Sequence, residues 1–294
     1  MKRPLHGVGW LAAFLMAGLF LAASAPAATT VNPTNKFAYG ANVGWTDWRG
    51  DTSNGAVIGE YVCSGSIYAA NVGWISLGSG TPTNGIRYQN ISSNDFGVNH
   101  DGVGNLRGYA YGANIGWVNF ETNGAPRVDL VTGRLNGWVY SANCGWISLS
   151  NTTAFLQTDS IQAGIDTDGD GMADAWERLN FNSLTNGPSD DPDGDGADNL
   201  AEYLAGTDPK DSDSTLRITS FAFDFEGADA SLVWTSVTNR HYFVERSPDL
   251  DVPGNWNTSQ LILPSNGTTT ASSVIDTNAA IRFYRIRAVR PLIP

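Results

Sequence analysis

The chain has 294 residues and a formal net charge of −12 at pH 7, from 29 acidic and 17 basic side chains. A strongly acidic chain is repelled by phosphate backbones, so nucleic acid is excluded as an expected partner. Only two cysteines are present, which excludes a disulfide-dense scaffold and leaves stability to hydrophobic cores.

The N-terminal segment, residues 1–28, has the pattern of a secretory signal peptide. Lys2 and Arg3 form a basic region, and the stretch 8–23 is apolar. Small residues then offer a cleavage site, and the apolar stretch is too short for a spanning helix. No later segment approaches the roughly 20 apolar residues needed to cross a bilayer. We therefore expect an exported chain that begins near Ala28, secreted, on the cell surface or in the periplasm, without a transmembrane anchor.

Residues 31–150 repeat the pattern Y-x-A-N-x-G-W four times. The copies end at Trp45, Trp74, Trp117 and Trp146, spaced 29, 43 and 29 residues apart. Asn and Gly tolerate positive φ, so each A-N-x-G stretch predicts a turn between two aromatic-bearing strands. Alternating apolar residues beside the turns favour strands. We expect an all-β repeat array of short antiparallel strands, closed or stacked so that each repeat covers its neighbour.

Each copy contributes one Tyr and one Trp, as in Tyr111 and Trp117. Every unit of a repeat array needs the same internal packing, which favours a place in the core for these aromatic residues. The alternative is an exposed row of rings that stacks on sugar rings or on a surface polymer. The pattern resembles glycine-tryptophan repeats in other predicted bacterial surface proteins, to which we attach no activity.

The two cysteines, Cys63 and Cys144, allow one disulfide in an exported chain. Cys144 takes the place that Val43, Val72 and Ile115 hold in the other copies. A role as a small buried hydrophobic residue is therefore an equal alternative, and the sequence leaves the pairing open.

Residues 151–213 hold most of the acidic charge. The part from 159 to 213 contains 15 of the 29 acidic residues and, as basic residues, only Arg178 and Lys210. Such a run is commonly a solvated or disordered face, in which acids are scattered. Here they fall twice into one twelve-residue pattern, with glycine at position 6. The first copy is Asp166, Asp168, Asp170, Met172, Asp174 and Glu177, and the second is Asp191, Asp193, Asp195, Ala197, Asn199 and Glu202.

This pattern is typical of a loop that binds Ca²⁺. Carboxylates at positions 1, 3 and 5 supply oxygens, and the glutamate at position 12 closes the shell with both oxygens. Met172 and Ala197, at position 7, would offer backbone carbonyls. Apolar residues follow each loop at helical spacing, first Trp176 and Leu179, then Tyr203 and others. Each loop is therefore expected to run into a short helix.

The stretch DTDGDGMADAWERLNFNSLTNGPSDDPDGDGADNLAEYLAGTDP resembles the bacterial thrombospondin type 3 repeats of secreted, multi-domain proteins. The portion DPDGDG…N-L-x-E-Y-x-x-G-T-D-P carries the resemblance. It implies about two calcium ions, one in each loop, with Asp174 and Asn199 bound directly or through a water. Dockerin modules are the nearest rival, but both loops here end in glutamate and carry Gly at position 4. Additional ligands from Asp208, Asp211 and Asp213 are a weaker possibility.

Residues 214–294 show alternating apolar positions in six or seven short segments, which predicts an antiparallel β-sandwich. The segment Tyr242-Phe-Val-Glu-Arg-Ser, a later Trp256 and the closing Phe283-Tyr-Arg-Ile-Arg resemble a fibronectin type III-like module. The chain as a whole is thus expected to be mainly β, with a short helix-containing connector of paired calcium loops between two β modules.

Few residues suggest catalysis. After residue 28 the only histidines are His100 and His241, and no serine-hydrolase elbow, zinc helix or phosphate loop occurs. Asp95 and Glu121 could be paired as glycosidase carboxylates, although turn or surface roles explain them adequately. We expect an exported, non-catalytic calcium-binding structural or adhesive protein whose partner is a surface polymer, glycan or protein. The alternative is a lectin-like carbohydrate-binding protein or a glycan-active enzyme with an unrecognised β fold.

Overall fold

The computed structural model describes residues 29–294 except 51–52, 225, 227, 251–255 and 276–282. The expected signal peptide, 1–28, lies outside the described residues. The described chain is mainly β with two short α-helices, which confirms the expected fold class at this level.

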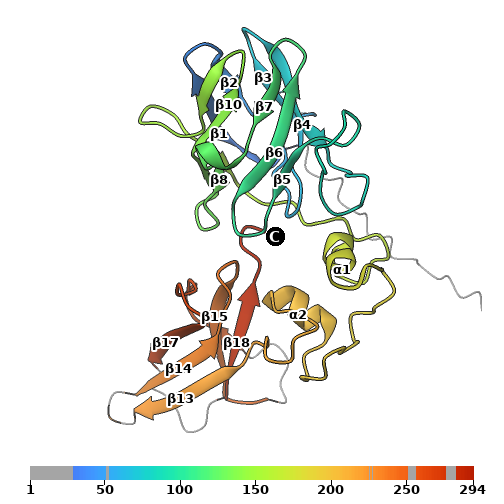
Figure 1. Ribbon diagram of the computed structural model, residues 1–294. Coiled ribbons are helices and arrows are strands. Elements are labelled where there is room, and N and C mark those ends of the chain that lie inside the picture. The colour runs from blue at the N-terminus through green and yellow to red at the C-terminus, as the bar shows by residue number, and fades with distance from the viewer. Residues whose placement is uncertain (1–28, 51–52, 225, 227, 251–255, 276–282) are drawn as a thin grey trace, which may run out of the picture.

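Eight strands of the N-terminal region form one closed antiparallel sheet (Figure 1). They are β1 (Val31–Gly40), β2 (Gly44–Asp47), β3 (Ser64–Ala69), β4 (Gly73–Ser79), β6 (Leu106–Gly112), β7 (Gly116–Asn119), β10 (Trp138–Ser141) and β11 (Gly145–Ser148). Each of these strands pairs with the next, and β11 pairs back with β1. The array is therefore closed and has no free edge along this ring of strands.

Shorter elements extend one end of the closed sheet. They are β5 (Val98–His100), η1 (Thr122–Gly124), β8 (Arg127–Val128), β9 (Arg134–Asn136) and β12 (Leu156–Thr158). Strand β12 pairs with β1 and β9, so the N-terminal unit includes residues beyond 150, where the sequence analysis placed its end.

Each Y-x-A-N-x-G-W copy forms one hairpin of the closed sheet, which confirms the predicted turns. In the second copy the Val72 amide donates to the Ala69 carbonyl at 3.2 Å, and Gly73 follows with φ +80°. The turn is therefore closed by a hydrogen bond between its first and fourth residues, and a left-handed glycine follows it. The glycine is required because other residues rarely adopt this φ.

The asparagine of each turn joins its hairpin to the preceding one around the sheet. Each Nδ2 donates to the carbonyl of the residue between Asn and Gly in the neighbouring copy. The four bonds are Asn71 to Val43 (3.2 Å), Asn114 to Val72 (3.0 Å), Asn143 to Ile115 (3.0 Å) and Asn42 to Cys144 (3.2 Å). Because the last bond joins the first copy to the fourth, the asparagines form a complete ring, here called the asparagine ring.

The repeated Tyr and Trp side chains lie on the outer face of the sheet, so the expectation that they form its core is wrong. All eight are 40–46% exposed: Tyr39, Trp45, Tyr68, Trp74, Tyr111, Trp117, Tyr140 and Trp146. Strand residues alternate between faces, and it is the neighbours of each Tyr and Trp that point inward. The buried inner residues near the hairpin ends are small or β-branched: Ala38, Ala69, Ile75, Ala110, Val118, Val139 and Ile147.

Both cysteines are free and buried, which answers the question that the sequence left open. Cys144 belongs to the same hydrophobic core as Val43 and Ile115, which hold the equivalent place in their copies. It therefore acts as a small hydrophobic residue at the turn end of the sheet.

The C-terminal region contains two three-stranded antiparallel sheets. One sheet comprises β13 (Ile218–Asp224), β14 (Asp229–Thr235) and β17 (Thr269–Ile275), and the other comprises β16 (Asn257–Thr258), β15 (His241–Ser247) and β18 (Phe283–Val289). Trp234 of the first sheet and Tyr242 of the second share one hydrophobic core, with ring centroids 5.9 Å apart. The two sheets thus stabilise each other.

The helices α1 (Asp174–Phe181) and α2 (Asn199–Ala205) lie along the chain between the two β regions (Figure 1). After β18 the chain returns to the N-terminal region. The Ile161 amide donates to the Leu292 carbonyl at 2.8 Å, and Leu292 and Ile293 pack against the core of the closed sheet. The C-terminal tail therefore ties the last strand to the first domain.

Removing one bond of the asparagine ring should destabilise the N-terminal domain. We expect Asn143→Ala to reduce its free energy of unfolding by about 1 kcal/mol, the usual net contribution of a hydrogen bond. Urea unfolding followed by circular dichroism measures this loss. The control is Asn257→Ala, which changes an exposed residue of strand β16. Equal stability of the two variants would show that the ring does not support the sheet.

Tryptophans of the two faces should differ in their contribution to stability. Trp48 is 2% exposed and packs near Phe120, so Trp48→Ala should cost about 3–5 kcal/mol. Trp117 is 45% exposed, so Trp117→Ala should cost less than half as much. Equilibrium unfolding of the two variants tests this, and equal losses would contradict the outward placement.

Candidate metal centre

Each acidic loop gathers three aspartates around a common point. One carboxylate oxygen from each of Asp166, Asp168 and Asp170 lies within 4.8 Å of the other two. The same holds for Asp191, Asp193 and Asp195 in the second loop. Oxygens at this spacing from positions 1, 3 and 5 are able to share one hard cation.

The first aspartate of each loop holds the loop backbone in place. Asp166 accepts hydrogen bonds from the amides of Gly169 at 2.7 Å and Gly171 at 3.0 Å. Asp191 repeats this with Gly194 at 2.8 Å and Gly196 at 3.1 Å. The two loops are therefore folded alike.

Glycine is required at positions 4 and 6 by backbone conformation. Position 4 has φ +77° in Gly169 and +75° in Gly194, and position 6 has +95° in both Gly171 and Gly196. A Cβ added at Gly169, Gly194 or Gly196 would meet nothing within 4 Å. The requirement therefore comes from φ alone.

The two glutamates at position 12 are buried and carry carboxylate oxygens without hydrogen-bond partners. Glu177 and Glu202 are fully shielded from solvent. Both oxygens of Glu177 and Oε2 of Glu202 have no partner, while Oε1 of Glu202 accepts from Thr207 at 3.1 Å. Leaving such groups unpaired in a folded protein is costly, so these oxygens indicate a ligand that is not part of the chain.

The electrostatics of these glutamates agree with that interpretation. Burial, followed by the negative charges of the loop aspartates, beginning with Asp170 and Asp168, raises the pKa of Glu177 to about 7. Burial raises the pKa of Glu202 to about 7 as well, with charges of Asp193 and Asp195 adding to the shift. A divalent cation among these oxygens would offset the aspartate repulsion that adds to the rise of both pKa values.

The two residues at position 9 are placed differently. Asp174 accepts hydrogen bonds from the amide and hydroxyl of Thr167, at 2.7 and 2.8 Å, and pairs with Arg178 at 3.0 Å. Its carboxylate thus stabilises the first loop and the start of α1. Asn199 instead has a buried Oδ1 without a partner, while its Nδ2 donates to the Gly187 carbonyl at 2.9 Å. In the second loop, position 9 therefore keeps an oxygen for a ligand.

The available atoms could hold a metal ion. Oδ2 of Asp193 and of Asp195 are further buried oxygens without partners, so the second loop offers several unused ligand atoms. All these donors are oxygens, which favours a hard cation over zinc or copper. Met172 and Ala197 donate their amides to Asp170 and Asp195, at 2.9 and 2.7 Å.

The weaker candidates beyond the second loop have local roles in the structure. Asp208 accepts a hydrogen bond from the Lys210 amide at 3.1 Å, and Asp211 accepts one from the Asp213 amide at 3.2 Å. Among the described residues, neither these two nor Asp213 belongs to an acidic group that could hold a metal ion.

The two loops pack against each other through their helices. Trp176 of α1 and Tyr203 of α2 have ring centroids 5.5 Å apart and share a cluster with Met172. Leu179, which the sequence placed on the same apolar face as Trp176, is instead about half exposed, and so is Leu204 of α2. Helix α2 ends at Gly206, its C-cap, which has φ +77°.

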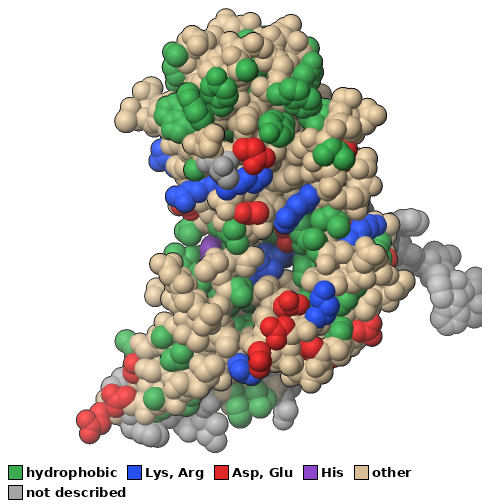
Figure 2. Space-filling model, viewed as in Figure 1, with side chains coloured by type: hydrophobic (Ala, Val, Ile, Leu, Met, Phe, Trp, Pro, Cys, Tyr) green, Lys and Arg blue, Asp and Glu red, His purple; other side chains and the backbone are tan. Residues whose placement is uncertain are grey.

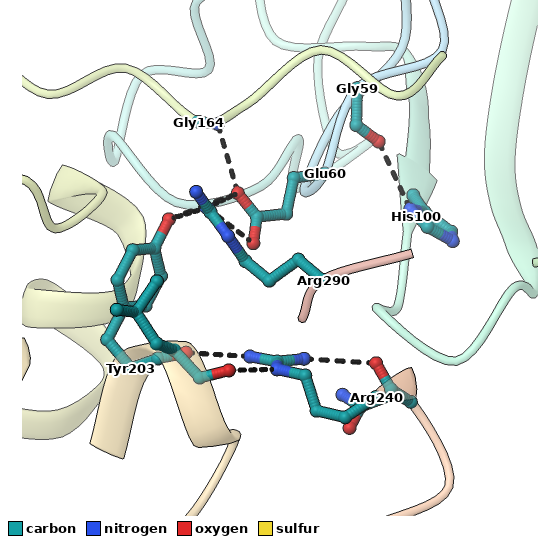
Figure 3. Close-up of polar contacts among 9 residues, drawn as sticks. Gly59, Glu60, His100, Gly164, Tyr203, Arg240 and Arg290 are labelled. Atoms are coloured by element: carbon teal, nitrogen blue, oxygen red, sulfur yellow. Dashed lines mark hydrogen bonds and ion pairs between the residues drawn. The ribbon is translucent and has the colours of Figure 1, made fainter. Parts of the chain in front are cut away.

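A polar junction connects α2 to both β regions (Figure 3). Oε2 of Glu60 accepts from the Tyr203 hydroxyl at 3.2 Å, the Gly164 amide at 3.1 Å and Arg290 at 3.1 Å. Arg240 donates to the carbonyls of Tyr203 and Leu204, each at 2.8 Å. Tyr203 directly follows Glu202, so the last residue of the second loop is adjacent in sequence to a residue of this junction. The sequence analysis missed this junction because its residues lie far apart along the chain.

The residues considered for catalysis have structural partners. Asp95 accepts from the amides of Thr83 and Gln89, each at 3.1 Å, and Glu121 accepts from the Gly108 amide at 2.9 Å. His100 is buried beside the Gly59 carbonyl, 3.1 Å from Nδ1, and burial lowers its pKa. His241 lies buried in β15.

No known protein family, curated protein or solved structure matches this chain. Within the described part, neither α-helix has the length and apolar character required to cross a membrane. The interpretation of the acidic loops therefore depends on their own geometry.

Substituting position 6 should strain a loop without a steric clash. We expect Gly196→Ala to destabilise the second loop by about 1–2 kcal/mol, the cost of a left-handed conformation for a residue with Cβ. Gly187→Ala is the matched control, because Gly187 lacks a positive φ and its added Cβ would be 3.9 Å from the nearest atom. Hydrogen exchange of the loop amides measures the difference, and equal exchange in both variants would contradict it.

Proposed function

We propose that this is an exported, non-catalytic calcium-binding protein of structural or adhesive type, in which calcium rigidifies the connector between two β modules. The observation that carries the proposal is the pair of buried position-12 glutamates, Glu177 and Glu202, with carboxylate oxygens that have no partner. Each glutamate has three loop aspartates nearby, and their negative charges add to the rise of its pKa that burial causes. Two oxygen-rich sites of the same design support about two calcium ions.

The arrangement of each loop supports a set of proposed ligands. In the first, Asp166, Asp168, Asp170 and Glu177 would hold the ion, with Met172 offering its carbonyl. In the second, Asp191, Asp193, Asp195 and Glu202 would do so, with Asn199 and the carbonyl of Ala197. Calcium would supply positive charge there and no reaction. The arrangement is consistent with the thrombospondin type 3-like repeats that the sequence resembles.

The contacts of α2 support the rigidifying role. Glu202 is the last ligand of its loop, and the next two residues present carbonyls to Arg240 of the C-terminal region. The Tyr203 hydroxyl reaches Glu60 of the N-terminal region. A helix of seven residues is too short to persist alone in water, so its order depends on these contacts and on its loop. Calcium binding would therefore favour the docked arrangement of both β regions.

Four finer assignments belong to the same proposal. The expected signal peptide, 1–28, supports export, where calcium is commonly available at millimolar concentration and modest affinity is sufficient. The N-terminal unit is proposed as a four-copy repeat domain and the C-terminal unit as a fibronectin type III-like sandwich. Asp95 and Glu121 each hold backbone amides, which supports a non-catalytic role.

Neutralising both position-12 glutamates should weaken both sites while preserving their shape. We expect the wild-type chain to bind about two calcium ions in calorimetry and Glu177→Gln with Glu202→Gln to bind them at least tenfold more weakly, because each site loses a charged bidentate ligand. In the wild type, calcium should also protect the connector, 163–213, from limited proteolysis relative to chelator.

Glu226→Gln is the matched control, since Glu226 is exposed and lies outside both loops. This variant should bind calcium as the wild type does. A wild-type chain that binds no calcium at millimolar concentration would overturn the proposed sites. A connector protected equally in calcium and in chelator would overturn the rigidifying role.

A further inference from the structure

We propose that the outer face of the closed sheet binds neutral polysaccharide, with repeated Tyr–Trp pairs as stacking platforms. A platform is defined as the Tyr and Trp that face each other across one hairpin. The four platforms are Tyr39–Trp45, Tyr68–Trp74, Tyr111–Trp117 and Tyr140–Trp146. This binding activity is separate from the calcium sites and goes beyond the function proposed for them.

The four platforms have nearly the same geometry. Their ring centroids are 4.9–5.0 Å apart, and the ring planes are inclined by 57–62°. All the rings are nearly half exposed although the inner face of the same strands is fully packed. A cross-strand aromatic pair stabilises a sheet by at most about 1 kcal/mol, and a smaller side chain on the outer face would leave the packed core unchanged, so fold stability alone does not require these exposed rings. Large aromatic rings at repeated exposed positions are instead typical of binding surfaces.

The tryptophan rings are held in place from one side. A Cβ on Gly50 would lie 2.7 Å from Trp74, and one on Gly124 would lie 3.0 Å from Trp146, so both rings rest against loops that contain glycine at the contact. Trp117 packs edge-to-face with Phe96 at 5.3 Å. Rings fixed in this way lose little freedom when a ligand binds, which favours recognition.

A polar side chain stands beside each tyrosine on the neighbouring hairpin. The strand register places Tyr68 opposite Asp47, Tyr111 opposite Ser76 and Tyr140 opposite Asn119. Directly opposed residues share a face, with Cβ atoms about 4.5–5.5 Å apart. The fourth partner, Ser148 opposite Tyr39, is buried, so three platforms combine aromatic rings with a partly exposed oxygen or amide group.

This combination fits a pyranose ring. One face of such a sugar presents C–H groups, which pack on an aromatic ring, and its edge presents hydroxyls, which need a hydrogen-bonding neighbour. The charge of the surface favours a neutral sugar. Figure 2 shows hydrophobic patches over the upper part of the closed sheet without acidic or basic side chains among them on the face drawn. Near the platforms, Asp47 is paired with Lys36 at 2.6 Å.

Other occupants fit less well. An anionic polymer or membrane would require basic side chains around the rings, as in aromatic surfaces that bind lipid headgroups. A tightly bound protein would require one continuous apolar patch, whereas the platforms are separated by the small polar residues of neighbouring strands. Because neighbouring platforms point in different directions around a closed sheet, each would hold its own chain segment. Binding to an insoluble or multi-chain polymer would then gain from several weak contacts.

The test is affinity electrophoresis of the full mature chain in calcium-containing native gels. The gels contain hydroxyethyl cellulose, galactomannan or dextran as neutral polymers and alginate as an anionic one, and flotation with phosphatidylcholine–phosphatidylglycerol vesicles tests lipid. We expect at least one neutral polymer to retard the wild-type chain, and we expect neither alginate nor vesicles to bind it. A variant with Trp45, Trp74, Trp117 and Trp146 all changed to Ala should lose it, and single variants should each lose part of it.

Phe221→Ala is the control, because Phe221 is an exposed aromatic residue of the C-terminal sheet. It should be retarded like the wild type. Because the fourfold variant could lose its fold, Asn119→Ala with Ser76→Ala provides a second test that keeps all eight rings and should weaken retardation. The two side chains also accept hydrogen bonds from the amides of Glu121 and Gly78, so circular dichroism checks that this variant keeps the sheet. Unchanged retardation in both multiple variants would overturn the proposal. It would also be overturned if no neutral polymer retards the wild type, or if alginate or vesicles alone bind it.

Discussion

Closure of the eight-stranded sheet, through the pairing of β1 with β11 and the asparagine ring, is the constraint on which the N-terminal architecture depends. Each turn asparagine binds a carbonyl of the neighbouring hairpin, and the bond from Asn42 to Cys144 joins the first copy to the last. Without closure, β1 and β11 would present unpaired edges. Closure with eight strands leaves an interior just wide enough for side chains, and here Ala38, Ala69 and Ala110 occupy it near the turns. The large aromatic rings are consequently on the outside.

Several features could be predicted from the sequence because they depend on neighbours along the chain. The A-N-x-G turns and the spacing of acids and glycines in the two loops are local patterns, and the structure has hairpins and acidic triads at these positions. The place of Tyr and Trp could not be predicted by repetition, because both faces of a repeated strand recur with the same period. The small residue beside each aromatic, such as Ala110 beside Tyr111, was the signal that distinguishes the faces.

The polar junction shows a different limit of sequence interpretation. Glu60, Tyr203 and Arg290 meet in space although long stretches of chain separate them. No local pattern predicts such a contact. The junction lies next to Glu202, the last residue of the second loop. The order of α2 therefore depends both on that loop and on the two β regions that contact the helix. Repulsion among the crowded carboxylates of the loop destabilises the ordered helix, and a bound cation would offset that repulsion.

The proposed sites and the aromatic platforms place different demands on the chain. A stacking surface requires rings that are already in position, which the closed sheet and the glycine-lined loops supply without metal. The connector requires charge neutralisation, since its loops contain the densest acidic sequence in the chain. The C-terminal tail links the two, because Leu292 and Ile293 pack against the core of the sheet while Arg290 contacts the Glu60–Tyr203 junction. Calcium would therefore act on how the C-terminal module is held relative to the platforms, while the platforms themselves would keep their shape in its absence.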